Sequence, residues 1–124
     1  MNKIAFEGFA RRASDTKVVA SEFEALCTAE GVTHLALFDA LAKHIALGYS
    51  DSGWSFQQAD AAMNNLWGLL ISQVKGGGWE IPEYFYAVYE AFDAGEHRHS
   101  GDPDSINPEE QYTKPRIAAL LDKT

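Results

Sequence analysis

Apolar residues recur three or four positions apart through most of this chain, and that spacing constrains the fold more than any other feature. Val19, Phe23 and Leu26, for example, fall on one side of a helix with 3.6 residues per turn. No stretch of useful length alternates apolar and polar residues at the two-residue period of a strand. The pattern therefore predicts an all-α fold. Its four main helices are expected over residues 16–30, 33–48, 55–74 and 82–95.

Glycines and capping residues divide this pattern into separate helices. Gly31 and Gly48 are the expected stops of the first two main helices. The triplet Gly76–Gly78 ends the third, because three glycines lose too much backbone entropy inside a helix. Thr33 and Ser55 are residue types whose side-chain oxygens accept from the free amides of a first helical turn. We therefore expect Thr33 and Ser55 to be N-caps.

The remaining boundaries follow from polar and proline residues. Ser14 or Asp15 is expected to cap the helix over residues 16–30, and Pro82 is expected to be the first residue of its helix. Asn107 is expected to start a last helical segment, which Pro115 should divide into a short turn and a helix over residues 115–121.

Length and helix number together predict the architecture. The chain has 124 residues, of which 46% are hydrophobic, and this is enough for one domain with a modest core. Residues 4–13 add a short helix before the four main ones. We expect a single domain over residues 1–124, folded as an antiparallel four-helix bundle with short extra terminal helices.

Charge and cysteine content limit the classes of function. The net charge of -8 disfavours direct binding to nucleic acid or to an anionic membrane surface, and it favours basic partners. Cys27, the one cysteine, cannot form an internal disulfide, and its apolar helix face predicts a core residue. Glu7 interrupts any N-terminal apolar stretch, and the longest uncharged run, residues 61–74, is too short to span a membrane. We expect a cytoplasmic protein without membrane contact.

The acidic residues are concentrated between positions 80 and 110. This segment holds nine carboxylates and a single formal cation, Arg98. Its net charge, nine minus one, is therefore the same -8 as that of the whole chain. Aromatic residues such as Tyr86 lie among the acids. The pattern fits an ordinary solvated helix face with a polar loop, or a surface for a basic partner. The candidate partner-binding residues are Tyr86, Glu90, Asp93, Glu96, His97, Asp102 and Asp104.

Two stretches resemble the colicin D-type immunity proteins. One runs from Ser14 to Glu30 and contains the sequence Lys-Val-Val-Ala-Ser-Glu-Phe-Glu-Ala-Leu-Cys. The other is Phe-Asp-Ala-Gly-Glu at 92–96, with an Asp-rich loop and a late helix ending at 117–121. The resemblance implies a small helical bundle that neutralises a tRNA-cleaving toxin. Related immunity proteins accompany the toxins of contact-dependent inhibition. It also implies that Glu96, Asp102 and Asp104 face the toxin's basic active site.

These observations lead to one expected function and two open alternatives. We expect an immunity protein, without cofactor or catalytic activity, that binds the nuclease domain of its toxin as a monomer in a 1:1 complex. The first alternative is an acidic helical adaptor or antitoxin that binds a basic protein other than a nuclease. The second is a small metal-dependent enzyme that uses His97, His99 and Asp102.

Overall fold

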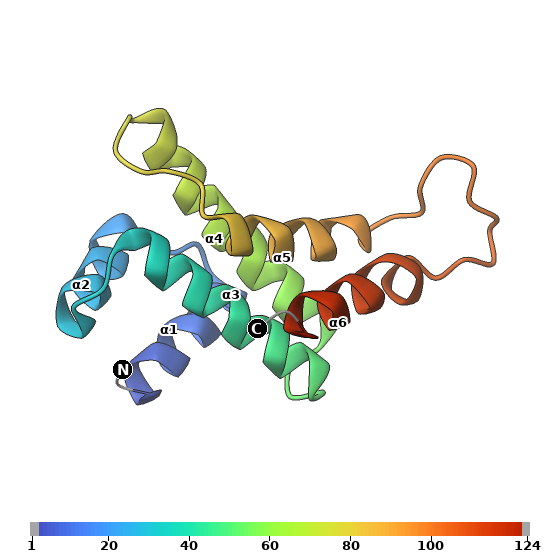
Figure 1. Cartoon of the computed structure of the whole chain (residues 1–124), viewed down its shortest axis with the longest axis horizontal. Helices are drawn as coiled ribbons and strands as arrows, with labels where there is room; N and C mark the ends of the chain where they lie inside the picture. Colours follow the sequence, from blue (N-terminus) through green and yellow to red (C-terminus); the bar gives the residue numbers. More distant parts are fainter. Residues whose placement is uncertain (1–2, 123–124) are drawn as a thin grey trace.

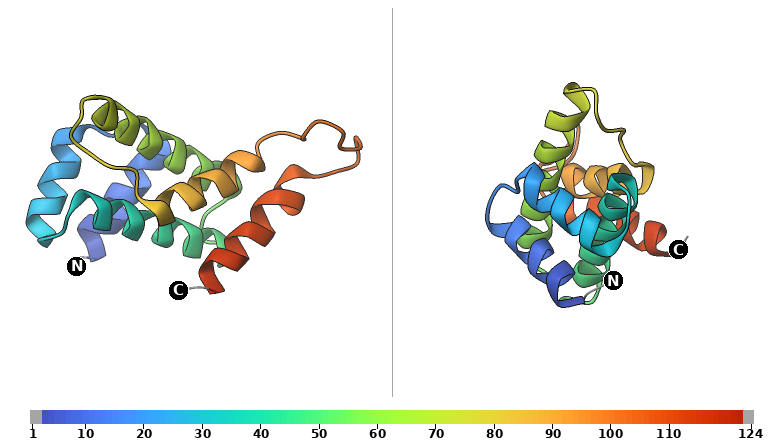
Figure 2. Two further views of the ribbon diagram at one scale, coloured as in Figure 1. Left: turned by 45° about the horizontal axis from the view of Figure 1, so that its top comes forward. Right: turned by 90° about the vertical axis from the view of Figure 1, so that its left-hand side faces the viewer.

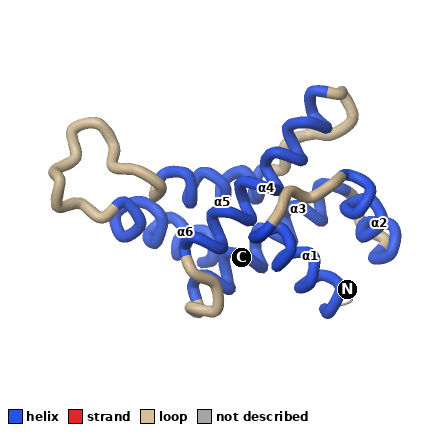
Figure 3. The backbone as a smooth tube through the Cα atoms, turned by 180° about the vertical axis from the view of Figure 1, so that it is seen from behind, coloured by secondary structure: helices blue, strands red, loops and turns tan. Residues whose placement is uncertain are grey.

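The computed structural model describes residues 3–122, and every regular element in that range is helical (Figure 3). The described residues contain no strand, so the prediction of an all-α fold is confirmed. The elements in chain order are α1 (Lys3–Asp15), α2 (Ala20–Glu30), α3 (His34–Ser50), α4 (Phe56–Lys75), α5 (Glu83–Ala94), the π-helical turn η1 (Glu109–Thr113) and α6 (Lys114–Asp122).

Several predicted helix ends are confirmed by their capping geometry. Gly31 follows α2 with a φ of 65°, a left-handed conformation that glycine adopts without a steric penalty. The Thr33 side chain accepts a hydrogen bond from the amide of Ala36 at the start of α3. Ser55 and Gln58 form a reciprocal capping box at the start of α4. The sequence therefore determines where these three ends fall.

The predicted start of the second helix is wrong. Ser14 and Asp15 belong to α1, and the Ser14 hydroxyl donates to the backbone carbonyl of Arg11 at 2.6 Å instead of capping a new helix. Helix α2 begins only at Ala20. Val19, which the periodicity assigns to a buried face, precedes α2 and is 49% exposed.

Gly48 lies inside α3 and does not end it, contrary to the prediction. The helix continues to Ser50, and the indole ring of Trp54 folds back onto the glycine. A Cβ atom at position 48 would overlap Cδ1 of Trp54, well inside the 3.0 Å that real contacts respect. This glycine therefore permits a close approach between the helix and the following turn.

Proline produces one irregular turn and shifts one boundary. Pro115 has no N–H group, so the usual bond to the carbonyl four residues earlier cannot form. The preceding residue, Lys114, instead bonds through its amide to the carbonyl of Glu109, five residues back. The result is a π-helical turn that runs directly into α6. Pro82 is the N-cap of α5, one position before its predicted place.

The helices surround one hydrophobic cluster. Helix α1 packs mainly against α4, while α3 contacts α4, α5 and α6. Helices α5 and α6 lie side by side in opposite directions, and the connecting loop extends well beyond them (Figures 1 and 2). Cys27 lies in this core, as predicted. The largest fully buried aromatic side chains are Phe9, Phe23, Phe38, Phe85 and Phe92.

The lengths and hydropathies of the described helices bear on membrane insertion. None of these helices alone is both long and apolar enough to cross a bilayer. Helices α2 and α3 meet the criteria of length and composition only when taken together, across a bend of 96°.

Candidate interaction surface

Side chains of α4 and α5 form an acidic and aromatic surface where the two helices pack together. Asn64 of α4 donates a hydrogen bond through Nδ2 to Oε2 of Glu96, which lies just after α5, at 3.1 Å. Asp60, one helical turn before Asn64, is also hydrogen-bonded to Glu96. We call this surface the acidic–aromatic face. It consists of Asp60, Asn64, Trp67, Tyr86, Tyr89, Asp93 and Glu96.

Asp60 is held in an environment that opposes its ionisation. Burial contributes most, followed by the hydrogen bond to Glu96 and the negative charges of Glu96 and Asp93. Together they raise the pKa of Asp60 from 3.8 to about 8. A carboxyl group that keeps its proton beside another carboxylate would release that proton when a cation approaches, because the cation stabilises both charges.

Three aromatic rings continue this surface along the two helices. The ring of Trp67 stacks on Tyr89 with centroids 4.4 Å apart, and Tyr86 lies 5.5 Å from the same indole. Tyr86 is 39% exposed, so part of the stack faces solvent. Burial and then the charges of Asp93, Glu96 and Asp60 raise the pKa of the Tyr89 phenol. Aromatic faces beside carboxylates are suited to guanidinium and ammonium groups.

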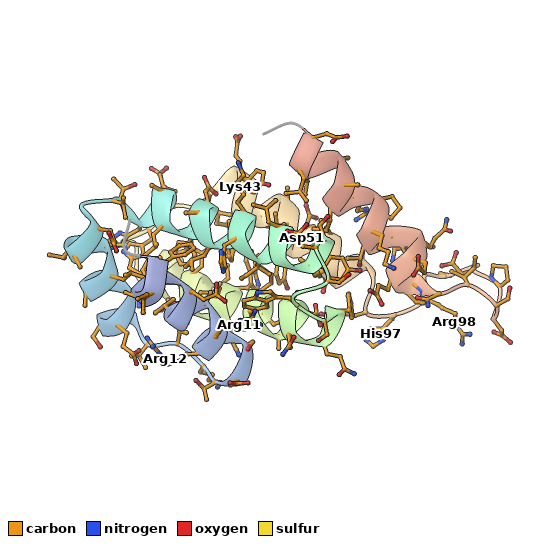
Figure 4. The ribbon with its side chains drawn as sticks, turned by 90° about the horizontal axis from the view of Figure 1, so that it is seen from below. Arg11, Arg12, Lys43, Asp51, His97 and Arg98 are labelled. Carbon is orange, nitrogen blue, oxygen red and sulfur yellow. The ribbon has the colours of Figure 1, made fainter. Side chains whose placement is uncertain are left out.

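No cation of the described residues neutralises this face. Lys, Arg and His side chains lie beyond ion-pair distance of its carboxylates throughout residues 4–122. Arg11 and Arg12 on α1 pair with other acids, and Figure 4 shows both apart from the loop that carries Arg98. Arg98 lies in the loop, 3.5 Å from Asp104. The charge of the face is therefore available to a partner.

Of the predicted binding residues, some lie on α5 or directly after it, and the two aspartates Asp102 and Asp104 lie in the loop. Tyr86, Asp93 and Glu96 belong to the acidic–aromatic face. Glu90 is exposed on α5, and His97 is exposed in the segment that follows it (Figure 4). The predicted polar side of this helix is therefore confirmed as a solvent-facing surface.

The two aspartates of the loop have different surroundings. Asp102 accepts hydrogen bonds from the Tyr112 hydroxyl and from the amide of His99. Both hydrogen bonds lower the pKa of Asp102, and the bond from Tyr112 contributes most. Its carboxylate therefore ties the loop to η1. Asp104 is fully exposed and has Arg98 as its ion-pair partner, so the loop offers less free negative charge than its sequence suggests.

The metal-site alternative has no geometric support. The ring of His99 stacks on Tyr112 with centroids 3.7 Å apart, and its Nε2 lies 2.9 Å from the carbonyl of Ala94. Within the part of the chain that the structure describes, no three His, Cys, Asp or Glu side chains converge to hold a metal ion. His97, His99 and Asp102 are thus not assembled as ligands.

Sequence reasoning missed the contribution of α4. Asp60, Asn64 and Trp67 are spaced by four and three residues, which places them on one face of a helix. Helical spacing also puts Trp67 in the apolar stripe of α4, whereas its side chain is only partly buried. Two polar residues in line with a tryptophan were the available signal. What the sequence could not reveal was that this face lies beside the end of α5.

The fold and this surface define a small helical protein with an un-neutralised acidic and aromatic patch. Comparisons with models of protein families, with curated proteins and with solved structures find no match for the chain.

Proposed function

We propose that this protein is an immunity protein that binds and neutralises a cognate nuclease toxin, one that cleaves tRNA. The proposal rests chiefly on one observation: the carboxyl groups of Asp60, Asp93 and Glu96 gather from two helices beside a partly exposed aromatic stack, with no cation of the described residues to balance them. Such a face complements a basic active site.

The chemistry of nucleases explains why this complementarity matters. An enzyme that cleaves RNA must hold phosphate groups, and it does so with lysine and arginine side chains. Carboxylates fixed on a helical scaffold can occupy the same cationic groups and exclude RNA. Tyrosine and tryptophan are the residues that most often dominate binding energy in interfaces. Tyr86 and Trp67 would serve as such anchors, and electrostatic attraction would speed association.

The resemblance to colicin D-type immunity proteins supports the same proposal. The second resembling stretch, residues 92–96, contains two acids of the acidic–aromatic face, Asp93 and Glu96. The proposal carries with it the remaining expectations: one immunity-type domain over residues 1–124, an antiparallel four-helix bundle, a cytoplasmic location and a 1:1 complex formed by a monomer.

Co-expression tests this function directly. The protein is produced together with the basic C-terminal domain of a toxin encoded by the adjacent gene, and growth is measured. Wild type should rescue growth. The double variant Asp93→Lys/Glu96→Lys should fail while remaining soluble and folded. Glu24→Lys reverses an exposed charge on α2, outside the acidic–aromatic face. It is the matched control and should rescue growth like wild type. Death of cells that contain soluble wild-type protein would refute the proposal.

A cleavage assay separates a nuclease inhibitor from an acidic adaptor. The purified toxin domain is incubated with total tRNA, with and without the protein at equal molar concentration. Inhibition of cleavage by wild type, and its loss in the double variant, is expected. A toxin domain that is bound but cleaves no RNA would favour the adaptor.

A further inference from the structure

A concave pocket shares none of its lining residues with the acidic–aromatic face. It has a volume of about 460 Å³ and lies where the last turn of α3, the start of α4 and the η1–α6 segment meet. This volume is within the range of small-molecule sites, roughly 300–1,000 Å³. Its lining residues are Tyr49, Ser50, Ser52, Trp54, Ser55, Phe56, Glu109, Lys114, Ile117 and Ala118.

Glu109 supplies an oriented carboxylate in this lining. The Tyr49 hydroxyl donates a hydrogen bond to Oε2 of Glu109 at 2.5 Å, which fixes the position of the carboxylate. The other oxygen, Oε1, has no hydrogen-bond partner among the residues that the structure describes. Glu109 belongs to η1, and π-helical turns are frequent at functional sites. The pocket thus contains a carboxylate oxygen able to accept a further hydrogen bond.

The groups that could favour an anion are already engaged. The ammonium of Lys114 lies 2.6 Å from Oε1 of Glu110, which offsets its charge. At the start of α4, the Ser55 hydroxyl accepts from the amide of Gln58, and the Gln58 side chain accepts from the amide of Ser55. The positive end of α4 therefore has part of its donor capacity satisfied by its own residues.

The electrostatic environment of Tyr49 agrees with a preference for cations. Burial and the hydrogen bond to Glu109 raise the pKa of the Tyr49 phenol, and the charges of Glu109 and Glu110 raise it further. The two carboxylates therefore contribute a negative potential at the Tyr49 hydroxyl. A cation in the pocket would be stabilised by that potential, and an anion would be repelled.

Apolar walls complete the site. Trp54, Phe56 and Ile117 line it from three different segments. The indole of Trp54 already attracts a cation from the α1 side, where the guanidinium carbon of Arg11 lies 4.2 Å from the ring centroid. These walls can hold a hydrocarbon or aromatic stem, while Glu109 holds a charged end.

We propose that this pocket binds a small organic cation, a primary amine or guanidinium on an apolar stem, through the carboxylate of Glu109 and the walls formed by Trp54, Phe56 and Ile117. The site is independent of the acidic–aromatic face. Neither success nor failure of the toxin-neutralisation experiment bears on this proposal.

A matched pair of probes tests it on the purified protein. Phenethylamine carries an ammonium group on an aromatic stem, and 2-phenylethanol carries a hydroxyl on the same stem. Calorimetric titration should show binding of the amine at least about tenfold tighter than of the alcohol, since the neutral hydroxyl can donate to the carboxylate but cannot form an ion pair with it. The indole N–H resonance of Trp54 should shift with the amine and report the location.

Three variants complete the experiment, each checked for an unchanged thermal unfolding profile. Glu109→Gln keeps an acceptor for Tyr49 but removes the charge, and it should weaken amine binding about tenfold or more. Ala118→Leu fills an exposed part of the lining and should weaken both probes. Glu24→Gln removes the same charge outside the pocket and should bind like wild type. Equal affinity for amine and alcohol, an unaffected Glu109→Gln variant, or no shift at Trp54 would overturn the proposal.

Discussion

The hydroxyl of Thr113 donates a hydrogen bond to the backbone carbonyl of Ala91 at 2.8 Å inside the protein core. Ala91 is among the last four residues of α5, whose carbonyls lack the usual helical partners. Gly95 allows this contact, because a Cβ there would overlap the Thr113 hydroxyl oxygen. The end of α5 is therefore joined to η1 by a side chain from the irregular turn.

Replacing this threonine tests the contribution of the joint. Thr113→Val keeps the shape but leaves the Ala91 carbonyl without its donor. The free energy of unfolding should fall by about 1–3 kcal/mol, the cost of an unsatisfied buried polar group. Urea denaturation measures it. Thr28→Val, at an exposed position of α2, is the control and should change stability by less than about 0.5 kcal/mol. Equal effects at both positions would contradict the role of the hydrogen bond.

A second prediction concerns two glycines inside helices. Gly48→Ala would place a methyl group against Trp54 and should destabilise the protein by about 1–3 kcal/mol through overpacking. Gly68 lies in α4, and a Cβ added there would meet no atom within 4 Å beyond its own stretch of helix. Gly68→Ala should therefore stabilise the protein by about 0.5–1 kcal/mol through the reduced entropy of the unfolded chain. Thermal unfolding should therefore show a lower melting temperature for Gly48→Ala and a higher one for Gly68→Ala. A change of the same sign in both variants would be inconsistent with the packing of Trp54.

The third prediction concerns pH. The pKa of Asp60 is about 8 in the folded protein and near 3.8 without the fold, so between these values the folded state binds a proton that the unfolded state releases. The contribution of Asp60 to stability must then fall as pH rises from about 4 to 8. Asp60→Asn removes this dependence. Its free energy of unfolding relative to wild type should increase with pH, by at most about 1.4 kcal/mol per unit.

Urea denaturation of both proteins at pH 5, 6, 7 and 8 provides this comparison. Glu24→Gln is the control, because Glu24 is exposed on α2 and should give a difference from wild type that stays nearly constant over the same range. A constant difference for Asp60→Asn as well would mean that Asp60 ionises normally.

A fourth prediction applies to the complex with the toxin. Reversing the charge at Glu96 should cost about 2–5 kcal/mol of binding if Glu96 pairs with a buried arginine or lysine. Glu83→Lys, at an exposed position on the first turn of α5, should mainly slow association and flatten its dependence on salt. Glu24→Lys should have little effect. Association and dissociation rates are measured against ionic strength. Equal weakening by Glu24→Lys and Glu96→Lys would assign recognition to another surface.

Local chemistry explains which parts of the fold are predictable. Thr33, Ser55 and Gly31 act through bonds or dihedral angles within a few residues, so their effects follow from neighbouring sequence. The predictions for Gly48 and Ser14 are wrong for the opposite reason. Gly48 accommodates a ring six positions later that folds back onto it, and Ser14 bonds to a competing carbonyl in its own helix.

The candidate site shows the same division. Helical spacing alone places Tyr86, Glu90 and Asp93 on the polar side of α5, and this is where they lie. Asp60 gains its unusual environment from Glu96 and Asp93, more than thirty positions later in the chain. Such a meeting depends on how α4 packs against α5. Periodicity identifies faces, but it does not identify which faces meet.

The attachment of the long loop to η1 has an evolutionary consequence. Asp102 and Tyr112 fasten the loop through their hydrogen bond, while Pro103, Asp104 and Ser105 beyond that point are exposed. Substitutions at these three tip positions remove no buried contact and cost little free energy of folding. Selection can therefore alter the tip's charge and shape without disturbing the helices. Among descendants of one ancestor, the tip is therefore free to diverge in sequence while the helical scaffold remains the same.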